Sequence, residues 1–341
     1  MKLSELIENA FLYDYAPKSF IDLNRLRENI RLIRQRVGVK LCAVVKSDAY
    51  GHGLCRIAQE AEPLCDCFAV ANFYEANSLR LSGVTKPIIC LLPFADLAAA
   101  VRCDIEITVV NHEDFLRVYL FYKASGQKPK IHFAVNSGMN RFGYDRPGEL
   151  RFDILHARNA GLEVVGVCSH FYNSIDYESM RRQYDLFCDF VDLVKSYYPN
   201  ALAHIAASGG AEYNEFHLDM VRIGMLMYGY KSINGTFDVK PIMKVIAYAA
   251  QHRKVFAGSP LLYGDYKLPS DESVSLLSYG YFDGLEECFG INDNCMNVTA
   301  MPGEKRFFEL SENLEKIARM NGKGLYKNLI RLGRVREKIY Y

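Results

Sequence analysis

Eight short runs of mainly apolar residues recur along the first 224 residues of the chain and constrain its fold more than any other feature. Each run is rich in β-branched or small side chains and is followed by a polar or amphipathic stretch. The runs are too continuous for half-exposed antiparallel strands, so they predict strands buried on both faces. They are residues 41–46, 67–71, 87–92, 105–110, 130–135, 164–170, 203–207 and 219–224.

Amphipathic segments between these runs predict helices, among them residues 54–61, 112–124, 147–159 and 177–197. Strands that alternate with helices indicate βαβ units and a parallel sheet. Eight such units in about 240 residues match the number and size of a (β/α)8 TIM-type barrel. A doubly wound open sheet is the alternative, because periodicity alone does not reveal whether a sheet closes.

The pattern changes after residue 240. Residues 245–255, 259–268 and 273–282 read as strands separated by Gly, Pro and Ser turns, without helices between them. One helix is expected over residues 311–320. We therefore predict an α/β barrel domain over residues 1–240 and a smaller β-rich domain over residues 241–341.

Composition excludes several classes of protein. The 41 basic and 40 acidic residues nearly cancel, which argues against nucleic-acid or membrane-surface binding. The apolar stretch Pro87–Phe94 is too short to cross a bilayer, and the acidic N-terminus does not resemble a signal peptide. The ten cysteines form no CxxC pair, so we expect no metal site. Buried thiols in a reducing compartment indicate a cytoplasmic protein.

Residues of unusual chemistry stand at the ends of the predicted strands, where barrel enzymes build their active sites. Lys46 closes the first run, His170 the sixth, and Arg222 lies near the end of the eighth. A lysine at the end of a buried strand is partly desolvated, which lowers the pKa of its amine and makes it a usable nucleophile. Each of these residues has a structural alternative, such as a surface lysine that starts a loop.

Two turns of small residues also follow strands, at Ser208-Gly209-Gly210 and around Gly224. Exposed backbone N–H groups beside a hydroxyl suit a phosphate group. Together with the lysine, the histidines and the arginines at the same face, these turns suggest a phosphorylated carbonyl cofactor held covalently by Lys46.

The segment AVVKSDAYGHG (43–53) resembles the cofactor-lysine signature of the alanine racemase family, which are pyridoxal-phosphate enzymes of fold type III. The resemblance covers nearly the whole chain, and the family has a barrel followed by a β domain. Further segments in the family's order are 136–145, 168–171, 204–208, 220–229, 261–266, 280–284 and 295–297, and residues 328–341 resemble its closing strand.

The resemblance implies a two-base mechanism for an amino-acid racemase, an isomerase. Lys46 would bind pyridoxal 5'-phosphate and act as one base. Tyr263 would be the other base, contributed by the partner subunit of a homodimer, with His170 as its oriented partner. Bases on opposite faces of the substrate Cα allow a proton to leave from one side and return from the other.

The resemblance also assigns residues to the cofactor. Arg222, backed by His204, would face the pyridine nitrogen, where related decarboxylases are expected to place a carboxylate. The residues that would hold the phosphate or the gate above it are Tyr50, Ser208, Gly224, Met225 and Tyr326.

For the substrate, the resemblance implies a small amino acid. Arg141 would steer its carboxylate with help from the backbone at Met296. Tyr281 and Tyr326 would narrow the entrance, which favours a side chain as small as a methyl or hydroxymethyl group.

Three departures from the family pattern bear on activity. Ala134 and Asn136 stand where many members carry a modified lysine and an acid that brace the arginine, here Arg141. Ala207 replaces an asparagine beside the phosphate serine. Residues 285–294 are shorter than the corresponding stretch in relatives, so the C-terminal domain is trimmed.

Alanine racemase is the first hypothesis. The alternatives are a related enzyme that acts on serine or a larger amino acid or decarboxylates it, and a non-catalytic pyridoxal-phosphate-binding protein built on the same barrel. An NAD enzyme is not supported, because AYGHG is no GxGxxG motif.

Overall fold

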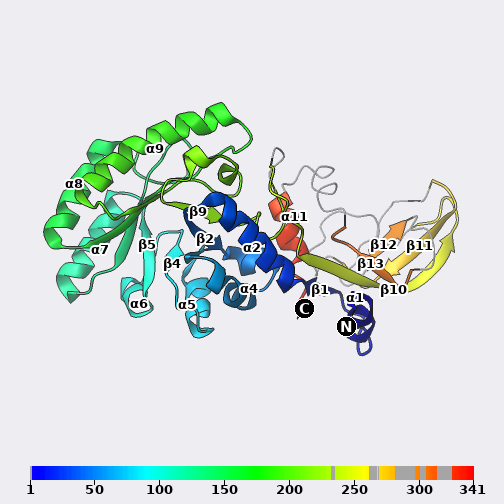
Figure 1. The fold of residues 1–341 in the computed structure, drawn as a ribbon. Coiled ribbons are helices and arrows are strands. Elements are labelled where there is room, and N and C mark those ends of the chain that lie inside the picture. Colours follow the sequence, from blue (N-terminus) through cyan, green and yellow to red (C-terminus); the bar gives the residue numbers. More distant parts are fainter. Residues whose placement is uncertain are drawn as a thin grey trace. The chain divides into compact units, whose positions relative to one another are not determined.

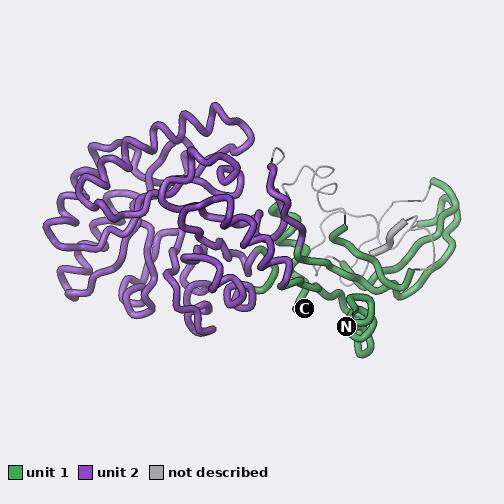
Figure 2. The backbone as a smooth tube through the Cα atoms, viewed as in Figure 1, with its two compact units in different colours: residues 1–23, 50–53, 242–341 green, residues 24–49, 54–241 purple. Residues whose placement is uncertain are grey.

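The computed structural model describes residues 2–231, 235–260, 267, 269–280, 296–299, 305–312 and 325–341. The chain divides into two compact units (Figure 2). The barrel unit consists of residues 24–49 and 54–241, and the strand unit consists of residues 1–23, 50–53 and 242–341.

The barrel unit contains one eight-stranded parallel sheet that is nearly closed (Figure 1). Its order is β8-β7-β6-β5-β4-β3-β2-β9, and the two end strands are joined by Asp219 N–H to Ala203 O and Arg222 N–H to Ala206 O, both at 3.1 Å. All eight predicted strands are confirmed, and the open-sheet alternative is wrong. They are β2 (Lys40–Val44), β3 (Cys67–Val70), β4 (Ile88–Cys90), β5 (Ile105–Val109), β6 (Lys130–Ala134), β7 (Glu163–Cys168), β8 (Leu202–His204) and β9 (Met220–Ile223).

Helices follow most of these strands and cover the outside of the sheet (Figure 1). The four predicted helices are confirmed as α4 (Leu54–Ala61), α7 (His112–Ser125), α8 (Pro147–Ala160) and α9 (Tyr177–Tyr197). The remaining helices are α2 (Leu23–Val37), α3 (Lys46–Gly51), α5 (Phe73–Leu81) and α6 (Leu97–Arg102), with short 3-10 turns η1 (Glu62–Leu64), η2 (Gly210–Glu212) and η3 (Asn214–Phe216).

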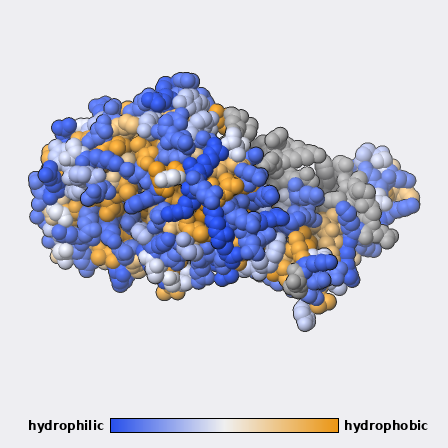
Figure 3. Space-filling model, viewed as in Figure 1, coloured by the Kyte–Doolittle hydropathy of each residue, from blue (hydrophilic) through white to orange (hydrophobic). Residues whose placement is uncertain are grey.

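Burial follows the pattern expected for strands covered on both faces. Every residue of β3, β4 and β9 is buried. On the surface of the barrel unit seen in Figure 3, hydrophobic residues are interspersed with hydrophilic ones. None of the helices in the described ranges combines the length and the apolar composition that crossing a bilayer requires.

The strand unit is built on a six-stranded sheet with the order β12-β11-β10-β1-β14, in which β13 also pairs with β10. Its elements are α1 (Leu3–Ala10), β1 (Lys18–Ile21), β10 (Met243–Val255), β11 (Glu272–Leu277), β12 (Met296–Thr299), β13 (Phe307–Glu309), α11 (Leu325–Leu332) and β14 (Glu337–Tyr340). Strand β1 runs antiparallel to β10 and parallel to β14.

The N-terminal segment therefore belongs to the strand unit, whereas we expected it in the barrel domain. Lys18 of β1 is 1% exposed and its ammonium donates to Asp14 at 3.0 Å and also to Glu337, which ties the segment to β14. The change of unit at Pro241 and Ile242 falls beside the expected boundary at residue 240.

The C-terminal expectations differ from the structure in one further respect. Residues 328–341 resemble a closing strand, but Asn328 to Leu332 form the end of helix α11 and only Glu337–Tyr340 are a strand. The buried side chains Leu329 and Leu332 follow helical rather than strand spacing, which explains the difference. Most of the helix expected over residues 311–320 lies outside the described residues.

Candidate active site

Lys46 follows β2 and begins a left-handed turn. The φ angles of Ser47, Asp48, Ala49 and Tyr50 lie between 52° and 56°. A left-handed helical conformation costs roughly 1–2 kcal/mol for each residue with a Cβ, so four such residues cost roughly 4–8 kcal/mol. Strain of this kind persists only where the surroundings hold the backbone in place.

Two carboxylates hold this turn. Glu75, in the first turn of α5, accepts hydrogen bonds from the N–H of Ser47 at 2.6 Å and of Ala71 at 2.8 Å. The Asp48 carboxylate accepts from the N–H of Leu54 at 2.8 Å. The strained turn is thus fastened to α5 and α4, and the position of Lys46 depends on both contacts. Glu75 was not among the site residues predicted from the sequence.

The electrostatic surroundings lower the pKa of the Lys46 amine. Burial is the main cause, and the positive charges of Arg141 and Arg222 act in the same direction. Glu75 opposes them and raises the pKa. A lowered pKa leaves more of the amine uncharged near neutral pH, which is the form that attacks a carbonyl group.

Arg222, on β9, is 5% exposed and is held by backbone oxygens. Its guanidinium donates to the carbonyl oxygens of Ser169 at 2.6 Å, His204 at 2.9 Å and Ile205 at 3.2 Å. Burial lowers the pKa of this guanidinium, but an arginine retains its charge across the physiological range. The orientation of a cation is therefore fixed at this face of the barrel.

His170 lies beside this cation, with its Nδ1 3.4 Å from Arg222 Nη2. Burial lowers the pKa of His170 to about 3, and the charges of Arg222, Arg141 and Lys46 contribute in the same direction. The imidazole is consequently neutral at physiological pH and can accept or donate a hydrogen bond without adding a charge.

Ser208 and Gly224 are adjacent in the structure. The Ser208 hydroxyl accepts hydrogen bonds from the N–H of Gly224 at 3.1 Å and of Leu226 at 3.3 Å. Two backbone donors therefore converge on one oxygen at the start of the segment after β9, which is the arrangement that binds phosphate oxygens. Met225 lies between these two donors in the chain.

Arg141 borders a small pocket in the barrel unit that is open to solvent. Burial lowers the pKa of its guanidinium, which lies over the ring of Phe142. Among the described residues that line this pocket there is no Asp or Glu, so its positive charges face a space suited to an anion. The lining includes Thr108, Ala134, Arg141, Cys168, His170 and Arg222.

Asn136 organises the loop that carries Arg141. Its side-chain oxygen accepts from the N–H of Gly138 at 3.1 Å and of Asn140 at 3.0 Å, and its amide nitrogen donates to Asp145 at 2.8 Å. These contacts shape the loop backbone. The carboxamide is thus occupied within the loop rather than directed at the guanidinium.

The other predicted site residues fall in the strand unit or outside the described residues. Tyr50 packs edge-on against Tyr326, with 4.7 Å between ring centroids. Met296 begins β12, where it pairs with Leu277. Tyr263 and Tyr281 lie outside the described residues.

Comparison with known proteins decides the family. Residues 21–232 match the family described as alanine racemase, N-terminal domain. The chain is also 34% identical over 286 residues to a Treponema denticola protein named alanine racemase, which covers 79% of this chain and 76% of that protein. The chain belongs to the alanine racemase family.

Other members of the alanine racemase family support this assignment along most of the chain. Alanine racemase 2 of Clostridium acetobutylicum is 32% identical over 79% of this chain and 71% of its own. The crystal structure of the Streptomyces lavendulae alanine racemase is 26% identical, has a TM-score of 0.86 and covers 96% of this chain and 97% of that chain. A Bartonella henselae alanine racemase, 24% identical with a TM-score of 0.84, was solved with covalently bound pyridoxal phosphate; it shares the fold over 96% of this chain and 99% of that chain.

Proposed function

We propose that this protein is a pyridoxal-phosphate-dependent alanine racemase, an isomerase that interconverts L- and D-alanine. The observation that carries the proposal is the Lys46 amine, whose pKa burial lowers, at the end of a barrel strand. Arg141 and Arg222 are the cations that act on it, and no described acid lines the adjacent pocket. The relatives named alanine racemase support the choice of substrate.

The residues of the barrel unit fit the cofactor. Lys46 would bind its carbonyl carbon covalently, the N–H groups of Gly224 and Leu226 with the Ser208 hydroxyl would hold its phosphate, and Arg222 would face its pyridine nitrogen. When bound, the cofactor withdraws electrons from the substrate Cα and makes its proton removable. We assign the remaining cofactor contacts to Tyr50, His170, His204, Met225 and Tyr326.

Each proton transfer would be carried out by a side chain of the protein. The Lys46 amine would remove or return the proton on one face of the Cα. The Tyr263 hydroxyl, from the partner subunit of a homodimer, would do so on the opposite face. Arg141 would hold the substrate carboxylate, with the Met296 backbone beside it and Tyr281 restricting the side chain to a small group.

A related enzyme that acts on serine or a larger amino acid is the second candidate. The observation that favours it is the Asn136 carboxamide, which bonds within its own loop. An arginine held by fewer partners can reach a carboxylate in more than one position. We also propose a cytoplasmic location, with which the free thiols of the eight described cysteines agree.

Proton NMR in D₂O with the cofactor-loaded protein and single L-amino acids tests both candidates. For an alanine racemase we expect the alanine Cα–H signal to disappear and D-alanine to accumulate, as measured by chiral chromatography. Lys46→Ala should abolish exchange, and Tyr263→Phe should abolish racemisation while the cofactor absorbance remains. Exchange with serine or larger amino acids but not with alanine would select the second candidate.

The homodimer is tested separately by mixing two inactive variants. Lys46→Ala and Tyr263→Phe subunits should regain up to about one quarter of the wild-type activity, because random pairing of shared sites leaves one intact site in each mixed dimer. Sedimentation of the wild-type protein as a monomer would contradict the shared site.

A further inference from the structure

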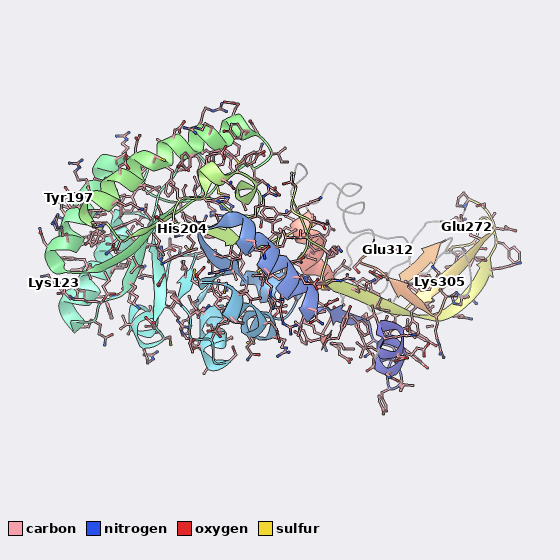
Figure 4. All side chains as sticks on the ribbon, viewed as in Figure 1. Lys123, Tyr197, His204, Glu272, Lys305 and Glu312 are labelled. Carbon is pink, nitrogen blue, oxygen red and sulfur yellow. The ribbon has the colours of Figure 1, made fainter. Side chains whose placement is uncertain are left out.

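Four side chains form a continuous hydrogen-bonded chain in the barrel unit, from Arg222 to Glu106. Arg222 Nη1 contacts His204 Nδ1, and His204 Nε2 is 3.2 Å from His132 Nδ1. His132 Nε2 is in turn 2.7 Å from the Glu106 carboxylate. This series of hydrogen bonds connects strands β9, β8, β6 and β5. In Figure 4, His204 is labelled at the sheet, away from Lys123 and Tyr197 on the outer helices.

The chemistry of the end groups fixes the direction of every bond. Arginine can only donate, so His204 Nδ1 must accept, and a neutral His204 then carries its proton on Nε2. That proton is donated to His132 Nδ1, which leaves the His132 proton on Nε2, facing the carboxylate of Glu106. Burial, together with the charge of Arg222, lowers the pKa of His204, which agrees with a neutral ring.

Gly166 of β7 leaves the space that this series of hydrogen-bonded side chains occupies. A Cβ added to Gly166 of β7 would lie 2.1 Å from His132 Nδ1, so only glycine allows the imidazole of the neighbouring strand to occupy this place. His132 and His204 are both fully buried, whereas Glu106 is 13% exposed at its side chain. The two rings thus link the cation to a carboxylate near the start of β5.

We propose that Glu106 and His132 are positioning residues that act through His204 to hold the Arg222 guanidinium in its orientation. Glu106 accepts the last hydrogen bond, which sets the tautomer of both histidines and leaves His204 Nδ1 as an acceptor. Without that acceptor, His204 could present an N–H to Arg222, and two donors would face each other. The consequence for catalysis rests on the proposed function, in which Arg222 faces the pyridine nitrogen.

The tautomers are tested by 15N NMR of histidine-labelled, full-length protein, with and without pyridoxal phosphate, at pH 6–8. We expect both rings to be neutral with the proton on Nε2, and His132→Phe identifies the His132 signals. A charged ring or an Nδ1–H tautomer at either residue in the wild-type protein would overturn the proposal. The measurement needs no turnover, so it stands whether or not the protein racemises alanine.

Glu106→Gln tests the role of the carboxylate. The glutamine amide can donate to His132 Nε2 and reverse the direction of the hydrogen bonds, so we expect the signals of both histidines to change. We also expect the apparent dissociation constant of pyridoxal phosphate to rise about tenfold, the size of effect seen when a hydrogen-bond partner of a metal ligand is removed. The matched control is Asp104→Asn, which removes the same charge two residues away, where Asp104 is exposed and pairs with Lys130 at 2.7 Å. Unchanged tautomers and cofactor affinity in Glu106→Gln, or equal changes in the control, would refute the proposal.

Discussion

Replacement of Glu75 by glutamine should disturb Lys46, the proposed cofactor-binding lysine, although Glu75 contacts the backbone beside that lysine and not its amine. The Glu75 carboxylate accepts from the N–H groups of Ser47 and Ala71 at 2.6 and 2.8 Å. Hydrogen bonds to a charged group contribute about 1.5–3 kcal/mol each, so the pair contributes about 3–6 kcal/mol. That is comparable to the roughly 4–8 kcal/mol of backbone strain in the left-handed turn after Lys46.

Glutamine keeps one oxygen, whose neutral hydrogen bond contributes about 0.5–1.5 kcal/mol, and it places an NH₂ group where the second N–H needs an acceptor. The turn should therefore lose about 2–5 kcal/mol of support. The lost negative charge also removes the influence that raises the pKa of Lys46, so that pKa should fall further below its ordinary value.

The assay is the rate at which cofactor-free protein captures pyridoxal phosphate, followed by absorbance across a pH series. Capture requires the uncharged amine, so the midpoint of the plot of capture rate against pH reports the Lys46 pKa. The plateau rate at high pH reports how well the amine is oriented. We expect Glu75→Gln to move the midpoint to lower pH and to reduce the plateau.

Glu62→Gln is the matched control for this experiment. Glu62 also accepts from two backbone N–H groups, those of Thr85 at 2.7 Å and Lys86 at 3.0 Å, and it is not among the charges that act on Lys46. Glu62→Gln should lower the free energy of unfolding without shifting the midpoint of the plot of capture rate against pH. A Glu75→Gln profile that coincides with the wild-type profile would refute the reasoning.

Three further substitutions have defined outcomes. Gly143→Ala would place a Cβ 2.6 Å from the carbonyl carbon of Val135 at a φ of 118°, so we expect a loss of about 1–3 kcal/mol or more in thermal or urea denaturation. Burial raises the pKa of Asp153, so the ionised carboxylate is less favourable in the folded protein than in the unfolded chain. The protonated carboxyl therefore contributes stability at low pH, and this contribution is lost as the pH rises from the ordinary pKa of 3.8 through the pKa in the folded protein. The melting temperature of the wild type minus that of Asp153→Asn should therefore decrease, or become negative, as the pH rises across that range. A difference that does not depend on pH would contradict a raised pKa of Asp153. Arg141→Lys, which loses the planar fork, should raise the KM for alanine about tenfold with a smaller effect on kcat, whereas an unchanged KM would place the substrate carboxylate elsewhere.

The barrel was predictable because its strands are buried on both faces, so each one is a continuous apolar run that can be recognised locally. Strand β1 was not recognised, because Lys18–Ile21 contains only two strongly apolar residues. Its burial depends on β10 and β14, which lie far away in the sequence. A local pattern carries no signal for such partners.

The same distinction applies to the candidate site. Lys46 and Arg222 stand at strand ends, where chemistry can be expected from position alone. Glu75, Glu106 and His132 act through neighbours on other elements, and each was indistinguishable in the sequence from an ordinary helix or strand residue. Only the structure reveals that Glu75 reaches the backbone beside Lys46 and that His132 lies over a glycine.

The place of β1 between β10 and β14 in the strand unit has a consequence for biosynthesis. Its two neighbours are β10 and β14, and Lys18 and Glu337 are 319 residues apart. At about 5–20 residues per second, a ribosome needs roughly 16–64 s to make the chain between them. During that time the emerging β1 has an unsatisfied edge, which is the kind of segment that joins foreign strands. Strand β1 is therefore synthesised long before its partner β14, and a chaperone that binds the nascent β1 segment should improve the yield of folded protein.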